Sequence, residues 1–104
     1  MARLDHGYVE LDLAGESVTL KPTLDAMQKI NRRFGSLRAA IEQLQGLDFE
    51  AVVFVIEVGA GRKDMAARVF EAGLTHVTAR VCEFVLLLMN PSARAGGAAE
   101  EGKV

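Results

Sequence analysis

The sequence has few of the residues that build disulfides, metal sites or nucleophilic centres. Among 104 residues there are one cysteine, two histidines, two prolines and no tryptophan. One cysteine cannot form an internal disulfide, which excludes a small secreted disulfide scaffold. His6, His76 and Cys82 are the only soft metal ligands, and neither a Cys-x-x-Cys nor a His-x-x-x-His pair is present. We therefore expect no metal site and no cofactor.

The sequence also lacks an excess of charge and a long apolar run. Basic residues number 12 and acidic residues 14, for a net charge of -2, which favours neither nucleic acid nor an anionic membrane as a partner. The most apolar runs, Ala51–Val58 and Val81–Met89, are far shorter than the ~20 residues of a membrane-spanning helix. Because Met1–Gly7 contains no apolar stretch typical of a signal peptide, we expect a cytoplasmic protein.

Alternating residues near the N-terminus predict a β-hairpin. Apolar and polar side chains alternate over Val9–Leu13 and again around Val18 and Leu20, on either side of the turn Ala14-Gly15-Glu16. One face of this hairpin is apolar. Since a lone hairpin is only marginally stable in water, the segments that follow are expected to cover that face.

Five helical segments follow, separated by glycines and each preceded by a residue that caps helices. They run over Leu24–Phe34, from Leu37 up to Gly46, and over Phe49–Val58, Met65–Ala72 and Thr75–Met89. The predicted caps are Thr23, Ser36, Asp48, Asp64 and Thr75.

The third of these segments is open to two interpretations. Val52–Ile56 is rich in β-branched residues and would suit a buried strand. The cap at Asp48, the apolar spacing from Phe49 to Ile56 and the stop at Gly59 favour a helix. A helix is the preferred interpretation, and a strand stays open as the alternative.

These patterns predict an α+β fold, mostly α, with an N-terminal β-hairpin packed on four to five short helices. The fold is expected to occupy residues 1–90 as one domain. Residues 91–104 have almost no large apolar side chain and are expected to form a disordered tail. The predicted core comprises Leu24, Ile30, Phe34, Leu37, Ile41, Val53, Ile56, Val81 and Val85.

No motif indicates an enzyme. Gly59-Ala60-Gly61 follows an apolar run as in a dinucleotide-binding fingerprint, but the third glycine of that pattern would fall at Asp64. The serines Ser17, Ser36 and Ser92 lie in a predicted hairpin, cap and tail rather than in a strained nucleophile turn. We expect neither catalytic residues nor a small-molecule substrate.

A helix-turn-helix is a further possibility. Ala66–Thr75 ends in an Ala-Gly-apolar-Thr turn ahead of the last helix. That helix is strongly apolar, and Arg80 is its only basic residue, whereas a recognition helix presents polar and basic side chains to DNA. A small DNA-binding regulator is therefore a less favoured alternative.

Several short motifs resemble the family of small tail-assembly proteins of phages and gene transfer agents, also labelled tail assembly chaperones or tail tube proteins. The resemblance is carried by the strand-to-helix junction Val18–Leu24, by Ile30, and by Phe34–Leu37, where a glycine precedes a Ser-Leu helix start. The loop, short helix and Gly-Leu turn between Gly59 and Gly73 also match.

The resemblance spans about Tyr8 to Met89, and it departs from the family at Asn31, where a glutamate is expected. It implies a non-enzymatic protein that associates with a tail protein, either the tape measure or the tail tube, before the tail polymerises. The alternative role within this family is a structural component retained in the assembled particle.

The apolar excess of the last helix is compatible with such a partner. Leu86, Leu87 and Met89 lie away from its main apolar stripe and are the predicted partner-binding residues. The same surplus would also suit a homo-oligomer interface or an ordinary core.

Overall fold

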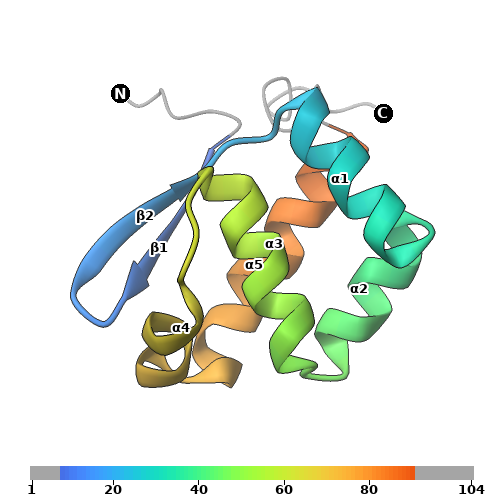
Figure 1. Cartoon of the computed structure of the whole chain (residues 1–104). Coiled ribbons are helices and arrows are strands. Elements are labelled where there is room, and N and C mark those ends of the chain that lie inside the picture. The colour runs from blue at the N-terminus through green and yellow to red at the C-terminus, as the bar shows by residue number, and fades with distance from the viewer. Residues whose placement is uncertain (1–7, 91–104) are drawn as a thin grey trace, which may run out of the picture.

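The computed structural model describes residues 8–90, which form a two-stranded hairpin against five helices (Figure 1). The predicted fold class is thereby confirmed. Residues 1–7 and 91–104 lie outside the described residues, and the predicted tail, His6 and Ser92 lie there with them.

The hairpin has the predicted strands and one buried face. Strands β1 (Val9–Leu13) and β2 (Glu16–Leu20) are antiparallel, and their turn residues Ala14 and Gly15 have φ values of 54° and 91°. Two positive φ values in a two-residue turn match the right-handed twist of the strands. The Asp12 carboxylate accepts a hydrogen bond from the Gly15 N–H at 3.1 Å and holds this turn. The buried face consists of Val9, Leu11, Leu13, Val18 and Leu20.

The first three helices begin where their caps predict. They are α1 (Leu24–Phe34), α2 (Leu37–Gln45) and α3 (Phe49–Ala60). The side chains of Thr23, Ser36 and Asp48 each accept a hydrogen bond from the backbone N–H three residues ahead, at 3.1, 2.9 and 3.1 Å. Each bond satisfies one N–H group that the first turn of a helix leaves unpaired.

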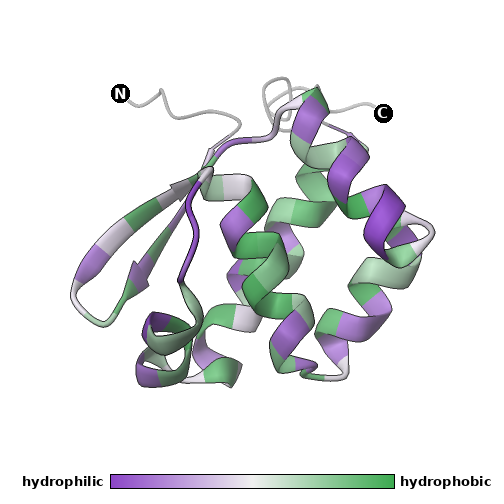
Figure 2. Cartoon of the chain, viewed as in Figure 1, coloured by the Kyte–Doolittle hydropathy of each residue, from purple (hydrophilic) through white to green (hydrophobic). Residues whose placement is uncertain are grey.

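α3 is a helix throughout, so the strand alternative for Val52–Ile56 is wrong. Its β-branched residues are buried on several sides because α3 packs against β2, α5, α1 and α2. Burial of this extent outweighs the modest β-propensity of valine and isoleucine. Figure 2 shows the resulting apolar character of α3 and α5, next to the more hydrophilic ribbon of α1.

A close approach joins α3 to the hairpin and to α5. The Lys21 N–H donates to the Gly59 carbonyl at 2.9 Å, which ties the end of β2 to the last turn of α3. A Cβ atom at Gly59 would lie 2.9 Å from the Phe84 ring and 3.2 Å from Leu20. Only glycine therefore allows α3 to pack this closely on the core. The glycine pair of the dinucleotide-like motif is thus the end of a helix.

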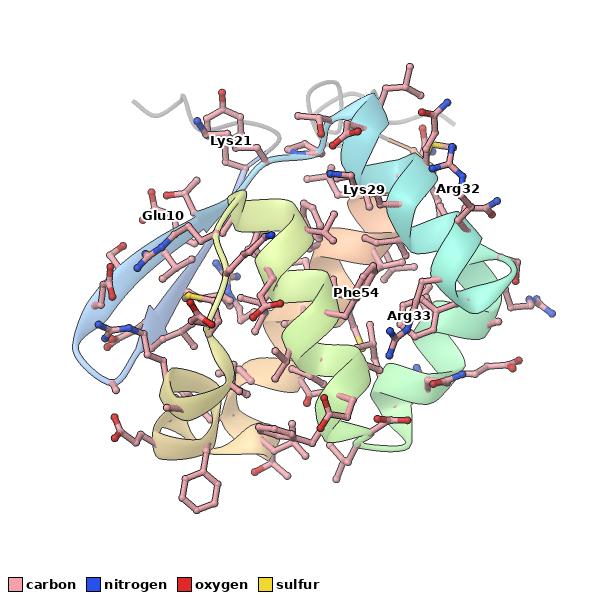
Figure 3. All side chains as sticks on the ribbon, viewed as in Figure 1. Glu10, Lys21, Lys29, Arg32, Arg33 and Phe54 are labelled. Carbon is pink, nitrogen blue, oxygen red and sulfur yellow. The ribbon has the colours of Figure 1, made fainter. Side chains whose placement is uncertain are left out.

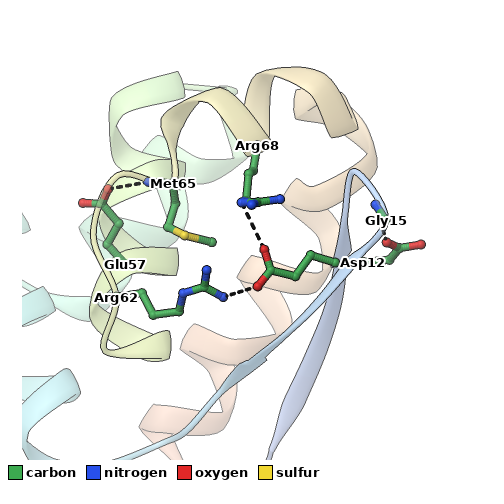
Figure 4. Close-up of polar contacts among 7 residues, drawn as sticks. Asp12, Gly15, Glu57, Arg62, Met65 and Arg68 are labelled. Carbon is green, nitrogen blue, oxygen red and sulfur yellow. Dashed lines mark hydrogen bonds and ion pairs between the residues drawn. The ribbon is translucent and has the colours of Figure 1, made fainter.

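α4 (Ala66–Ala72) does not use its predicted cap. Asp64 has φ 62°, whereas a capping residue needs an extended backbone, so the prediction of Asp64 as a cap is wrong. The Glu57 carboxylate of α3 instead accepts a hydrogen bond from the Met65 N–H at 3.0 Å (Figure 4). A residue from a neighbouring helix thus fixes the entry to α4.

α5 (Leu74–Met89) also begins without a side-chain cap. Gly73, at φ 98°, ends α4 and starts α5 at once, so Thr75 lies inside the first turn and its prediction as a cap is wrong. A different hydroxyl in the helix, that of Thr78, donates to the Leu74 carbonyl at 2.7 Å. Its polar group is therefore satisfied within the helix.

An ion-pair cluster clips the hairpin turn to the α3–α4 segment (Figure 4). The Glu16 carboxylate lies 2.7 Å from Arg62 Nη1 and 3.0 Å from Arg68 Nε. The hydrogen bond from Arg62, assisted by the charges of both arginines, lowers the pKa of Glu16 although partial burial acts in the opposite direction. The Oε1 atom facing Arg68 is shielded from water, while the side chain as a whole is about one-third exposed at 35%.

Most of the predicted core is buried, with one clear error. Leu24 is 67% exposed, because it lies in the first turn of α1 where no other element covers it. The inward position of this turn is occupied by Ala26. The buried members of the prediction are Ile30, Leu37, Val53, Ile56, Val81 and Val85, and Phe34 and Ile41 are half-buried against them.

Candidate functional site

The predicted partner-binding residues of α5 lie on two different surfaces. Leu86 is 55% exposed and Met89 is 49% exposed, whereas Leu87 is 5% exposed and belongs to the core. Leu87 is therefore wrongly assigned to the partner surface. Successive residues of a helix are turned by about 100°, so Leu87 shares the buried face with Phe84, three residues earlier, and Leu86 points away from it.

Leu86 and Met89 end a stripe that runs along α5 beside its buried face. The members alternate in spacing between four and three residues, as side chains on one side of a helix do. From Thr75 to Met89 this stripe extends about 21 Å. Its residues are exposed apart from one half-buried cysteine, and they are Thr75, Ala79, Cys82, Leu86 and Met89. The large apolar side chains are thus concentrated at the C-terminal end.

A groove between α2 and α5 joins this apolar end to a second helix. It has a volume of about 410 Å³, with Ile41 of α2 facing it alongside Leu86 and Met89. The α2 side of the groove also bears three polar side chains, Arg38, Glu42 and Gln45. An apolar strip with a polar border between two helices is the form of surface that accepts an amphipathic helix.

The contribution of α2 was not among the predicted site residues. The pattern of Leu37, Ala40, Ile41 and Leu44 predicts which side of α2 is buried, and the structure buries all of these except Ile41, which is half-buried. It carries no information on which helix packs beside α2, and the pairing with α5 brings together segments about 45 residues apart. The sequence pattern assigns Ile41 to the core, so it contains no signal that this side chain faces a groove.

Three further features of residues 8–90 concern metal ligands, the cysteine thiol and the length of the helices. Within this range, no three His, Cys, Asp or Glu side chains gather in a way that would hold a metal ion. Burial raises the pKa of the Cys82 thiol, which favours the protonated and less nucleophilic form. In the same range no single helix has the length and apolar composition to cross a membrane. Only α4 and α5 taken together have that length and composition, and the two helices are bent by 115° relative to each other.

The α4–Gly73–α5 unit has the connectivity and the large bend of a helix-turn-helix. Seven residues of α5 are nevertheless buried in the core. Arg80 donates to the Glu10 carbonyl at 3.0 Å and to the Glu83 carboxylate at 2.8 Å. Arg80 is thus engaged within the fold. The exposed side of α5 presents the apolar side chains of Leu86 and Met89. This geometry suits a protein partner better than the groove of DNA.

Comparison with protein-family models, with curated proteins and with solved structures finds no match to this chain.

Proposed function

We propose that this chain is a non-enzymatic tail-assembly protein of a phage-like particle or gene transfer agent, acting as a chaperone for the tape-measure or tail-tube protein. The observation that supports it best is the α2–α5 groove. There α5 exposes two large apolar side chains, Leu86 and Met89, beside the half-buried Ile41.

The chemistry of the groove defines what it binds. An amphipathic helix with apolar side chains at positions i, i+3, i+4 and i+7 would place them on Ile41, Leu86 and Met89. The polar border formed by Arg38, Glu42 and Gln45 would contact the flanks of that helix. Because the central contact is apolar, binding should depend only weakly on ionic strength.

This mode of binding meets a physical need of tail assembly. A tape-measure protein is a long, largely helical chain that exposes apolar surface before the tube encloses it. Exposed apolar surface on an incompletely assembled chain promotes aggregation. A small protein that covers one helical segment at a time would keep such a chain soluble until the tube polymerises.

Co-purification with a tape-measure or tail-tube protein tests the proposal. The wild-type chain should retain a tape-measure or tail-tube fragment, and Leu86→Asp combined with Met89→Asp should reduce retention at least ten-fold. Phe70→Asp is the matched control, because Phe70 is an even more exposed apolar residue, at 77%, on α4 outside the groove.

Two results would contradict the proposal. One is that neither tail protein is retained by the wild-type chain. The other is that Phe70→Asp reduces retention as much as the groove variant does. Stoichiometric recovery of the chain in purified particles would instead assign it as a structural tail component.

A further inference from the structure

The stripe along the exposed side of α5 has a nearly symmetric spacing. In Figure 1, α5 runs behind α3, with the hairpin on one side of it and α2 on the other. The middle member of the stripe is Cys82. The other members lie three and seven residues before Cys82 and four and seven residues after it. Reversal of the helix therefore returns nearly the same spacing, which suits a surface that pairs with its own copy.

The side chains of the stripe differ in size between its two ends. Thr75 and Ala79, at the N-terminal end, are small and exposed. Leu86 and Met89, at the C-terminal end, are large and about half exposed. An antiparallel pair of α5 helices centred on Cys82 places Leu86 of each copy opposite Ala79 of the other. It likewise places Met89 opposite Thr75. Large side chains that face small ones allow two helices to interdigitate closely, so the stripe is complementary to itself in shape.

Two charged side chains beside the stripe support the same centre. Arg80 and Glu83 lie two residues before and one residue after Cys82, and they pair with each other at 2.8 Å. Arg80 also donates to the carbonyl of Glu10, a residue of the hairpin (Figure 3), so both charges border the β1 side of the stripe. In the antiparallel pair the β1 sides of the two copies meet, because the two-fold axis runs across both helices. Arg80 of each copy then faces Glu83 of the other, which makes the surface complementary to itself in charge as well.

We propose that the chain forms a symmetric antiparallel dimer through α5, in which a second copy covers the stripe and Cys82 lies at the two-fold axis. One helix pair about 21 Å long buries less than the ~1,200–2,000 Å² of a standard interface, so this dimer is weak and reversible. The proposal goes beyond the function above and concerns this chain alone. Leu86 and Met89 also line the α2–α5 groove, so the dimer and a helix bound in that groove exclude each other.

Sedimentation equilibrium of the full-length chain under reducing conditions tests the proposal. The wild type should pass from monomer to dimer as its concentration is raised. Ala79→Glu should raise the dimer dissociation constant by about ten-fold or more, because the glutamate is solvated in the monomer but lies against Leu86 in the dimer. Ala79 does not line the α2–α5 groove, so this variant should retain a tail-protein fragment at least as well as the wild type.

The matched control is Gln28→Glu, which adds the same charge at an exposed position of α1. α1 packs on α2 and α3, and Figure 3 shows that it already bears several charged side chains, among them Arg32 and Arg33. Gln28→Glu should therefore leave the dissociation constant of the dimer unchanged within about two-fold. Both variants should keep the thermal midpoint of the wild type when all three are measured at a concentration where the monomer prevails.

Two further measurements test the alignment of the helices. Cys82 is the only cysteine of the chain, so a short bis-maleimide should join two copies through this position, and several-fold less in Ala79→Glu at the same concentration. Arg80→Glu should weaken the dimer, because like charges then meet across the two-fold axis. Arg80→Glu combined with Glu83→Arg should restore it, since the exchange forms the same pairs with their signs reversed.

Three outcomes would overturn this inference. The wild-type chain would stay monomeric at every concentration, or Ala79→Glu and Gln28→Glu would weaken a dimer equally, or the exchange of Arg80 and Glu83 would fail to restore what Arg80→Glu removes. If Ala79→Glu does not fold, the charge exchange decides alone. Failure of the wild type to retain a tail protein would contradict the proposed function and leave the dimer intact.

Discussion

The first three helices and the last two are positioned by different kinds of contact. α1, α2 and α3 begin at Thr23, Ser36 and Asp48, each bonded to an N–H three residues ahead. α4 and α5 begin without a side-chain cap. The entry to α4 depends on Glu57, eight residues before the N–H it accepts. Local chemistry therefore sets the boundaries of one region, and tertiary packing sets those of the other.

The largest expected effects come from the core, where the two regions should behave alike. Ile30 of α1 and Val81 of α5 are both fully buried. Truncation of either to alanine should lower the free energy of unfolding by about 2–5 kcal/mol, measured by urea denaturation. Leu24→Ala, at an exposed position, should cost less than about 0.5 kcal/mol. A loss that small for Val81→Ala would show that α5 is not part of the shared core.

The next effect tests the close approach between the regions. Gly59→Ala should gain up to about 1 kcal/mol from helix propensity, but its Cβ would clash with Phe84. We expect a net loss of about 1–3 kcal/mol, since the ring lies in a packed core. Gly46→Ala is the control, because a Cβ there meets its nearest atoms at an ordinary 3.5 Å. Equal stability of the two variants would mean that Phe84 of α5 can move away from the added Cβ atom at little cost in free energy.

Removal of caps distinguishes the two regions directly. Asp48→Ala should lower the free energy of unfolding by about 1 kcal/mol, because an N–H at the start of α3 loses its acceptor. Asp64→Gly removes the side chain but still allows the left-handed backbone at φ 62°, and it should lower the free energy of unfolding by less than about 0.5 kcal/mol, since Asp64 caps nothing. Thermal unfolding of both variants measures the difference. A cost at Asp64 equal to that at Asp48 would refute the contrast between local and tertiary boundaries.

The smallest effect concerns the clip between the hairpin and the α3–α4 segment. The hydrogen bond from Arg62 lowers the pKa of Glu16, so the folded state binds this proton less readily than the unfolded state. The stability it supplies is present above the unfolded pKa and is lost as the pH falls through the folded pKa. Glu16→Gln should therefore lose less stability than the wild type on acidification, as followed by thermal midpoints. Parallel pH curves would show that the clip contributes nothing.

Much of the fold could be predicted because its signals are local. Period-two alternation, helical spacing and glycine stops identified the hairpin and all five helices of residues 8–90. The wrong predictions concern residues whose conformation or burial depends on neighbouring elements of the fold. Asp64 has the composition of a cap but adopts a left-handed backbone, and Leu24 has helical spacing but lies beyond the elements that would cover it.

The candidate site was predicted only in part for the same reason. Leu86 and Met89 could be found because they lie off the main stripe of α5, and the exclusion of Leu87 needed the position of its neighbours. The contribution of α2 to the groove joins residues that are distant in sequence. Periodicity within one helix cannot report such pairings.

Methyl NMR during titration with a tail-protein fragment tests the central claim, that α5 exposes a partner surface next to α2. The methyl signals of Ile41, Leu86 and Met89 should shift together and saturate with the fragment. Those of Leu24 and Leu47, which are exposed apolar residues outside the groove, should stay unchanged. Shifts confined to Leu24 or Leu47, or no methyl shift at a saturating concentration of the fragment, would contradict the account.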